Sequence, residues 1–196
     1  MKEGKSVLEF SFLSGDPVVA AEKLIGCRLV RKTAKGTIRV QITETEAYSG
    51  ADDPASHAYR GVTPRNRLMF GEVGVLYVYF IYGMHYCMNI VAHRPGEVGA
   101  VLLRAGVALE GIDLIRANRP NTADRNLLNG PGKLAKALEI DMSFNGYHVL
   151  QPSPGTAEEL ALEFGAAAKP IHRTSRIGIS KGTELPWRFV MNAGEK

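Results

Sequence analysis

The sequence is poor in cysteine and has no uninterrupted apolar segment long enough to cross a membrane. Its 196 residues include two cysteines, Cys27 and Cys87, both in apolar surroundings, which indicates buried thiols in a reducing compartment. A membrane helix needs about 18 consecutive apolar residues, whereas the longest apolar segment is interrupted by Gly83, His85 and Asn89. The first ten residues contain neither an apolar core nor a small-residue cleavage site. We therefore expect a cytoplasmic protein with no membrane partner.

Signatures of metal, nucleotide and nucleophile chemistry are also missing. The five histidines and two cysteines form no Cys-x-x-Cys pair and no histidine pair at helical spacing, so we expect no metal. There is no Walker loop, no dinucleotide fingerprint and no Gly-x-Ser-x-Gly elbow. The sequence therefore predicts a protein without a cofactor.

Basic residues predominate only in the later part of the chain. The net charge of +4 arises entirely beyond residue 59, because basic and acidic side chains balance before it. Two clusters stand out: Arg60, Arg65 and Arg67, and then Lys169, Arg173, Arg176, Lys181 and Arg188. Such clusters suit a face that binds a polyanion, since each phosphate contact releases counterions. An ordinary solvated surface is the alternative.

Residues 75–91 form the longest largely apolar part of the sequence. The two arms, 75–81 and 84–91, predict neighbouring strands of a sheet. Tyr82-Gly83 lies between them and can reverse the chain tightly, because glycine reaches positive φ without strain. Polar residues are the usual choice at such a tip. An aromatic side chain there indicates contact with a partner.

A second anomaly lies in the predicted strand 37–48, which follows strand 27–32 in another hairpin. Apolar and polar residues alternate regularly over 38–43. If this period of two continues, the apolar face also carries Glu44, Glu46 and Tyr48, and the opposite face carries Thr45 and Ala47. An inward carboxylate is costly unless paired, and desolvation favours a general base. A β-bulge that turns these acids outward, or a buried ion pair with an arginine, is the structural alternative.

The remaining elements are expected to surround the two hairpins. In chain order we predict a helix over 18–25, an irregular segment over 49–74, a strand over 100–103, helices over 109–118 and from 131, a short helix over 157–164, and closing strands within 171–179 and 187–190. Irregular segments longer than about 12–15 residues are usually functional or disordered. His57 lies in this one and could return to the pocket of Glu46.

Several motifs follow one another in a familiar order. They are Glu44-Thr45-Glu46-Ala47-Tyr48, His57, Thr63-Pro64-Arg65-Asn66-Arg67, Tyr77-Val78-Tyr79-Phe80-Ile81-Tyr82-Gly83-Met84, Cys87-Met88-Asn89, Val101-Leu102-Leu103-Arg104, Asn129-Gly130-Pro131-Gly132-Lys133-Leu134 and Arg176-Ile177-Gly178-Ile179. In these motifs the chain closely resembles the alkyladenine (3-methyladenine) DNA glycosylases of the mammalian methylpurine type. The resemblance covers nearly the whole chain.

The resemblance implies a mixed α+β fold. A single domain over residues 1–196 would contain a curved antiparallel β-sheet, surrounding helices and a protruding β-hairpin, without a helix-hairpin-helix motif. It also implies a monofunctional enzyme that flips alkylated purines, such as 3-methyladenine, out of duplex DNA and hydrolyses the N-glycosidic bond to start base excision repair. The expected partner is double-stranded DNA containing damaged purines. We expect a monomer of bacterial type, associated with the nucleoid through its substrate.

The resemblance further implies roles for individual residues. Glu46 would be the general base that activates water for attack on C1′, and Arg104 would help to hold that water. The base-binding pocket would be formed by Tyr48, His57, Tyr79 and Asn89, with Asn89 obstructing the 2-amino group of guanine. The duplex would be entered by Tyr82, with Met84 and His85 beside it. Further contacts with DNA or the active site are expected from Arg65 and Lys133.

The residues favour this chemistry independently of the resemblance. An aromatic wedge can fill the space left by an extruded base, whose unstacking costs a few kcal/mol. A carboxylate suits deprotonation of water, whereas a lyase needs an amine nucleophile. Tyr48 and Tyr79 would favour a cationic purine through cation–π interactions of roughly 0.5–2 kcal/mol.

Two other classes of function are weighed against this one. A non-catalytic protein that binds damaged DNA would have no need for Glu46 beside Arg104, and a hydrolase of free nucleosides would have no duplex for Tyr82 to fill. His85-Tyr86 also replaces the Tyr-Phe of mammalian members. We therefore expect grip on DNA and selection of the base to differ from theirs.

Overall fold

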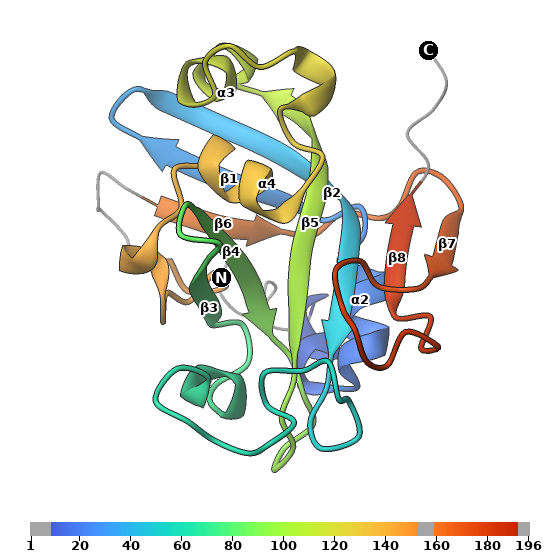
Figure 1. The fold of residues 1–196 in the computed structure, drawn as a ribbon. Coiled ribbons are helices and arrows are strands. Elements are labelled where there is room, and N and C mark those ends of the chain that lie inside the picture. Colours follow the sequence, from blue (N-terminus) through green and yellow to red (C-terminus); the bar gives the residue numbers. More distant parts are fainter. Residues whose placement is uncertain (1–8, 153–158, 192–196) are drawn as a thin grey trace.

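The computed structural model describes residues 9–152 and 159–191. Its strands are β1 (Arg28–Thr33), β2 (Gly36–Tyr48), β3 (Leu76–Ile81), β4 (His85–Val91), β5 (Ala100–Glu110), β6 (Glu159–Glu163), β7 (Ile171–Thr174) and β8 (Arg188–Met191). They form one antiparallel sheet in the order β3-β4-β5-β2-β1-β6, with β8 pairing both β2 and β7. The long strands β2 and β5 run side by side through the middle of the molecule (Figure 1).

Three α-helices accompany the sheet in the described residues: α2 (Pro17–Leu24), α3 (Ile112–Asn118) and α4 (Pro131–Ala137). Helix α2 packs on β2, and α4 packs on β4 and β5. Within the described ranges no α-helices are joined as a helix-hairpin-helix, because the segment 119–130, whose one helical turn is the 3-10 helix Asp124–Asn126, separates α3 from α4. The mixed α+β fold with a curved antiparallel sheet is thus confirmed. None of the described helices is long and apolar enough to cross a membrane.

Helix α2 begins one residue before the predicted range 18–25. The side chain of Asp16 accepts a hydrogen bond from the Val18 backbone N–H at 2.8 Å, and Pro17 occupies the first helical position. The helix ends at Leu24, and Gly26 follows with φ of +92°. Its buried alanines and Leu24 join the main core beneath β2.

The β3–β4 hairpin also forms as expected. Tyr82 and Gly83 have φ of +54° and +68°, so both residues of the turn occupy the left-handed region. This conformation is natural for glycine and unusual for tyrosine. The Tyr82 side chain is 79% exposed. The hairpin therefore protrudes with an aromatic ring at its tip.

The prediction for the end of β2 is wrong in one respect. Ile42 pairs with Gly106 and Glu44 with Ala105, so Thr43 is an extra residue that forms a β-bulge. Beyond the bulge, Thr45 and Ala47 are fully buried on the core side, where the Thr45 hydroxyl donates to the Ala21 carbonyl of α2. Glu44, Glu46 and Tyr48 therefore point away from the apolar face of residues 38–42. The bulge foreseen as the structural alternative is present, yet Glu46 remains fully buried.

Strand β5 is longer than the predicted strand 100–103. It continues to Glu110 because residues 105–108 and Glu110 pair with residues 39–42 and Glu44 of β2. Helix α3 accordingly starts at Ile112 and not at residue 109. Gly111 separates the two elements with φ of +77°, and a Cβ there would lie 2.4 Å from the Thr37 carbonyl oxygen.

The short helix predicted over 157–164 is wrong for the residues that the structure describes. Glu159–Glu163 is a strand that pairs with β1. Leu160 and Leu162 are buried while their neighbours are partly exposed, which is the period of two of a half-buried strand. Residues 157 and 158 lie outside the described ranges. The edge of β1 selects the strand over the helix, because its backbone groups gain partners there.

Candidate active site

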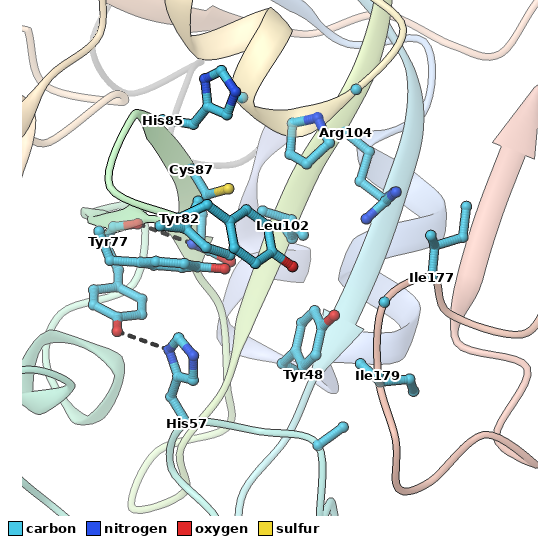
Figure 2. Close-up of a pocket in the computed structure, with 18 of the residues that line it drawn as sticks. Tyr48, His57, Tyr77, Tyr82, His85, Cys87, Leu102, Arg104, Ile177 and Ile179 are labelled. Atoms are coloured by element: carbon cyan, nitrogen blue, oxygen red, sulfur yellow. Dashed lines mark hydrogen bonds between the residues drawn. The ribbon is translucent and has the colours of Figure 1, made fainter.

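A cavity of about 440 Å³ opens between the β3–β4 hairpin and the middle of the sheet. Its volume is in the usual range for ligand pockets. Tyr48 and Arg104 from β2 and β5 lie across it from the hairpin residues, and the segment with Ile177 and Ile179 closes one side (Figure 2). The first turn of α4 forms a further wall.

Glu46 lies directly behind the cavity wall and is 0% exposed. Its Oε2 accepts hydrogen bonds from the Tyr48 hydroxyl at 2.9 Å and from Nη1 of Arg104 at 3.1 Å. Its Oε1 accepts the backbone N–H of Ile177 at 2.7 Å. All three donor residues line the cavity. A carboxylate has about four acceptor positions, so one position remains on Oε1.

Burial and charge keep the Tyr48 hydroxyl a donor. Burial, together with the neighbouring charge of Glu46 and the hydrogen bond to it, raises the pKa of Tyr48 far above its ordinary value. The phenol therefore keeps its proton at neutral pH and donates a hydrogen bond to the Glu46 carboxylate.

Arg104 connects two carboxylates. Its Nε donates to Oε1 of Glu44 at 2.7 Å, and the same oxygen accepts Nε of Arg188 at 2.7 Å. Burial opposes the charge on Arg104, but Glu46 and Glu44 outweigh it and raise the pKa of the guanidinium. Burial likewise opposes the charge on Glu44, yet hydrogen bonds from Arg188 and Arg104 lower the pKa of its carboxyl. The ion pairs foreseen as a structural alternative are thus present beside an open cavity.

Aromatic rings form the wall opposite Tyr48. The ring of His57 meets Tyr79 edge-on with centroids 4.8 Å apart, and its Nδ1 lies 2.9 Å from the Tyr77 hydroxyl (Figure 2). Burial, with a smaller contribution from the charge of Arg65, lowers the pKa of His57. Burial raises the pKa of Tyr79. The wall is therefore neutral and aromatic at neutral pH, which suits a flat base.

Asn89 adds a polar group to this wall. It is 4% exposed, lines the cavity, and donates from Nδ2 to the Tyr77 carbonyl at 3.0 Å. It is opposite Leu102 of β5, which also lines the cavity. This bond fixes the amide of Asn89 at the cavity wall.

The structure brings most of the remaining predicted residues to the cavity, but not all. Tyr82, His85 and Lys133 line it, and Nζ of Lys133 donates to Oδ1 of Asn129 at 2.8 Å. Met84 is 69% exposed and borders a neighbouring hollow instead. Arg65 lies outside, with its guanidinium carbon 5.4 Å from the centre of the Tyr79 ring.

Three contributors were missed by sequence reasoning. The strand period places Tyr77 on the same face as Tyr79, so alternation could have identified it. The bridging position of Glu44 between two arginines and the backbone N–H of Ile177 depend on contacts between distant segments. Ile177 lies in the predicted closing strand 171–179, but only Ile171–Thr174 is a strand. The Ile177 N–H serves Glu46 and not a strand ladder.

In the predicted basic cluster near the end of the chain, Lys169 and Lys181 are exposed, whereas the three arginines pair with acids. Arg176 is buried with Asp53, Arg188 donates to Glu44, and Arg173 pairs with Glu22. In the ranges that the structure describes, no group of three or more His, Cys, Asp or Glu side chains is arranged to hold a metal ion.

Comparison with known proteins identifies the family. The family model described as Methylpurine-DNA glycosylase matches residues 11–195. A protein of Carboxydothermus hydrogenoformans is 42% identical over 185 residues, which cover 94% of this chain and 95% of that protein. Relatives from Chlorobaculum parvum and Prosthecochloris aestuarii are 44% and 46% identical, over 93% and 90% of this chain and 86% and 84% of their own. All three carry the name "Putative 3-methyladenine DNA glycosylase". The chain belongs to the methylpurine-DNA glycosylase family and is an enzyme of the DNA glycosylase class.

Proposed function

We propose that this protein rotates alkylated purines, 3-methyladenine among them, out of duplex DNA and hydrolyses their N-glycosidic bond. The observation that carries the proposal is the buried Glu46 carboxylate, held by three donors whose residues all line one cavity. The free acceptor position on Oε1 is suited to take a proton from water. The water oxygen then forms a bond to C1′ while the bond from C1′ to the purine nitrogen breaks. The electron pair of that bond leaves with the base.

The other wall residues take complementary roles in this proposal. Arg104 holds the attacking water beside Glu46, while Tyr48, His57 and Tyr79 contact the extruded base. The neutral aromatic surface favours a purine made cationic by alkylation, through interactions of roughly 0.5–2 kcal/mol. Asn89, fixed by its bond to Tyr77, obstructs the 2-amino group of guanine.

The hairpin tip serves the duplex and not the base. Tyr82 lines the mouth of the cavity and is 79% exposed, so its ring can occupy the space that a rotated-out nucleotide leaves. His85 and Met84 flank it. Arg65 and Lys133, at the outer side of the pocket, are candidates for contact with phosphates.

Release of free base from methylated duplex DNA tests the proposal. The wild-type protein releases methylated purines, and Glu46→Gln lowers the single-turnover rate by about 100-fold or more. Glu110→Gln is the matched control, since Glu110 forms a surface ion pair with Arg39 away from the cavity. A protein that only binds damaged DNA would release no base. A nucleosidase would act on free methylated nucleosides without the duplex.

Borohydride trapping tests whether the enzyme is monofunctional. A lyase forms an imine between an amine and C1′, and borohydride reduces this imine to a permanent cross-link. Lys133 lines the cavity and would supply such an amine. If water is the nucleophile, base is released at the usual rate in the presence of borohydride and no protein–DNA cross-link forms. A cross-link through Lys133 would contradict the monofunctional mechanism.

A further inference from the structure

Arg176 and Asp53 form an ion pair in the interior. Both side chains are 0% exposed, and two guanidinium nitrogens of Arg176 donate to the two carboxylate oxygens of Asp53 at 2.6 and 2.7 Å. Desolvating two charges is costly, so a buried pair is weak evidence for a stabilising role. The contacts of this pair indicate another purpose.

The guanidinium of Arg176 contacts the segment that carries the site. Its Nη1 donates to the carbonyl of Ala47 at 2.9 Å. Its carbon lies 4.7 Å from the centre of the Tyr48 ring and 5.2 Å from that of Trp187. A planar cation is suited to stack on aromatic faces while it donates in its own plane. Arg176 thus holds the ring of Tyr48 and the backbone next to it.

These contacts reach two of the three donors to Glu46. Ala47 lies between Glu46 and Tyr48 in the chain, so its carbonyl fixes the backbone from which both side chains project. Ile177 follows Arg176 directly, and its N–H is the donor to Oε1 of Glu46. A shift of Arg176 would therefore displace the Ile177 N–H and the Tyr48 hydroxyl together.

Asp53 anchors this arrangement to the segment after β2. Its Oδ2 accepts the backbone N–H of Ser49, and its Oδ1 accepts that of Ala55, each at 3.1 Å. The same segment leads directly to His57. Asp53 also neutralises Arg176, so the pair places no net charge behind Tyr48.

We propose that Arg176, held by Asp53, is a positioning residue that fixes Tyr48 and the Ile177 N–H against the Glu46 carboxylate. This inference rests on the proposed function, in which Glu46 activates water. Arg176 does not touch the cavity in this role and acts through its neighbours. Its loss should slow the chemical step without weakening the grip on DNA.

Arg176→Lys is the direct test. It keeps the charge that Asp53 needs but loses the planar fork and the stacking face. We expect the single-turnover rate on methylated duplex at saturating enzyme to fall about 10- to 100-fold, as small misplacements of reacting groups do. The Kd for a duplex with a stable abasic-site analogue should stay within about twofold, by the same separation of binding from chemistry.

Arg173→Lys is the matched control. Arg173 likewise pairs with an acid, Glu22, and lies 5.2 Å from the Phe189 ring, but it is on the surface, and neither of these partners lines the cavity. Its rate should equal that of the wild type. Asp53→Asn serves as the second variant if Arg176→Lys does not fold, and it should show the same fall in rate at unchanged Kd.

A double-mutant cycle separates positioning from general damage. If Arg176 acts through Tyr48, the rate loss of Arg176→Lys combined with Tyr48→Phe is smaller than the product of the single losses. Two results would overturn this inference while leaving the proposed function intact. One is a wild-type rate in folded Arg176→Lys and Asp53→Asn, and the other is a rate loss in the double mutant equal to the product of the two single losses. Failure of the wild-type protein to release any base overturns the proposed function, and this inference with it.

Discussion

Glu44 accepts the Nε–H of Arg104 at 2.7 Å, and this bond orients the guanidinium of Arg104 at the cavity wall. Arg104 then presents Nη1 to Glu46. In β5 Arg104 is itself an extra residue, because Glu44 pairs with Ala105 and Thr45 with Leu103. Two bulges, at Thr43 and Arg104, thus lie on neighbouring strands beside the buried carboxylate. Bulges re-aim side chains at functional sites.

Glu44→Gln is expected to slow base release about 10-fold through loss of the orientation of Arg104. Binding to abasic-analogue duplex should be unchanged, since Glu44 does not line the cavity. Single-turnover rates and Kd values measure the two effects separately. Glu110→Gln, which breaks a surface pair with Arg39, should retain the wild-type rate. An equal loss in both variants would contradict the assigned role of Glu44.

The same carboxylate predicts a pH dependence of stability. The pKa of Glu44 is below its ordinary value of 4.5 in the folded protein, so its contribution is fully present above that pH and is lost as the pH falls through the folded value. The difference in unfolding free energy between wild type and Glu44→Gln should therefore be largest at neutral pH and shrink below about pH 4. Urea unfolding at several pH values measures it. A difference that grows on acidification is the contrary result.

Tyr82→Asn should have opposite effects on stability and on function. Asparagine adopts positive φ more readily than tyrosine, and Asn-Gly is a favoured hairpin turn. With φ of +54° at this position, we expect stability to rise by about 0.5–1 kcal/mol. Binding to lesion-containing duplex should weaken because the wedge is lost. Leu109→Asn, at another exposed apolar residue, should leave lesion binding unchanged.

His57 should titrate below its ordinary pKa of 6.5, since burial, and then Arg65, disfavour its charged form. The unfolded chain therefore binds this proton more readily, and His57 makes stability fall as the pH drops through 6.5. Arg65→Gln should raise the pKa of His57 while leaving it below the ordinary value, because burial remains. Histidine NMR titration measures the shift. Arg67→Gln is the control, and an unchanged pKa of His57 in Arg65→Gln would exclude the contribution of Arg65.

Much of the fold could be predicted from the sequence, because the strongest patterns in it depend on residues that are close together in the chain. The β3–β4 hairpin, the capped helix α2 and Gly-Pro at the start of α4 each depend on neighbours in the chain. The errors arose where tertiary contacts decide. Leu160 and Leu162 fit the pattern of a strand, but only the edge of β1 makes that strand form.

The candidate site was predictable in its residues and less so in its geometry. Glu46, Tyr48 and Tyr79 stand out as polar or aromatic groups in apolar strands. The direction of Glu46 was inferred from an unbroken alternation, which the Thr43 bulge interrupts. The alternation of apolar and polar residues does not predict such a bulge. The pairing of Asp53 with Arg176 spans 123 positions and gives no local signal at all.

Because Thr43 forms a bulge, insertions and deletions should have different effects before the bulge and within it. Upstream of it the strand pairs with β1, and downstream with β8, while β5 accompanies both parts. Lengthening or shortening the β1–β2 turn would leave the orientation of Glu46 intact. Deleting Thr43 would exchange the two faces of the downstream half of the strand. Glu44 and Glu46 would then point into the apolar core, and Thr45 and Ala47 would point toward the cavity. Natural variants of this chain should therefore differ in the length of the β1–β2 turn but keep the same number of residues between Ile42 and Glu44.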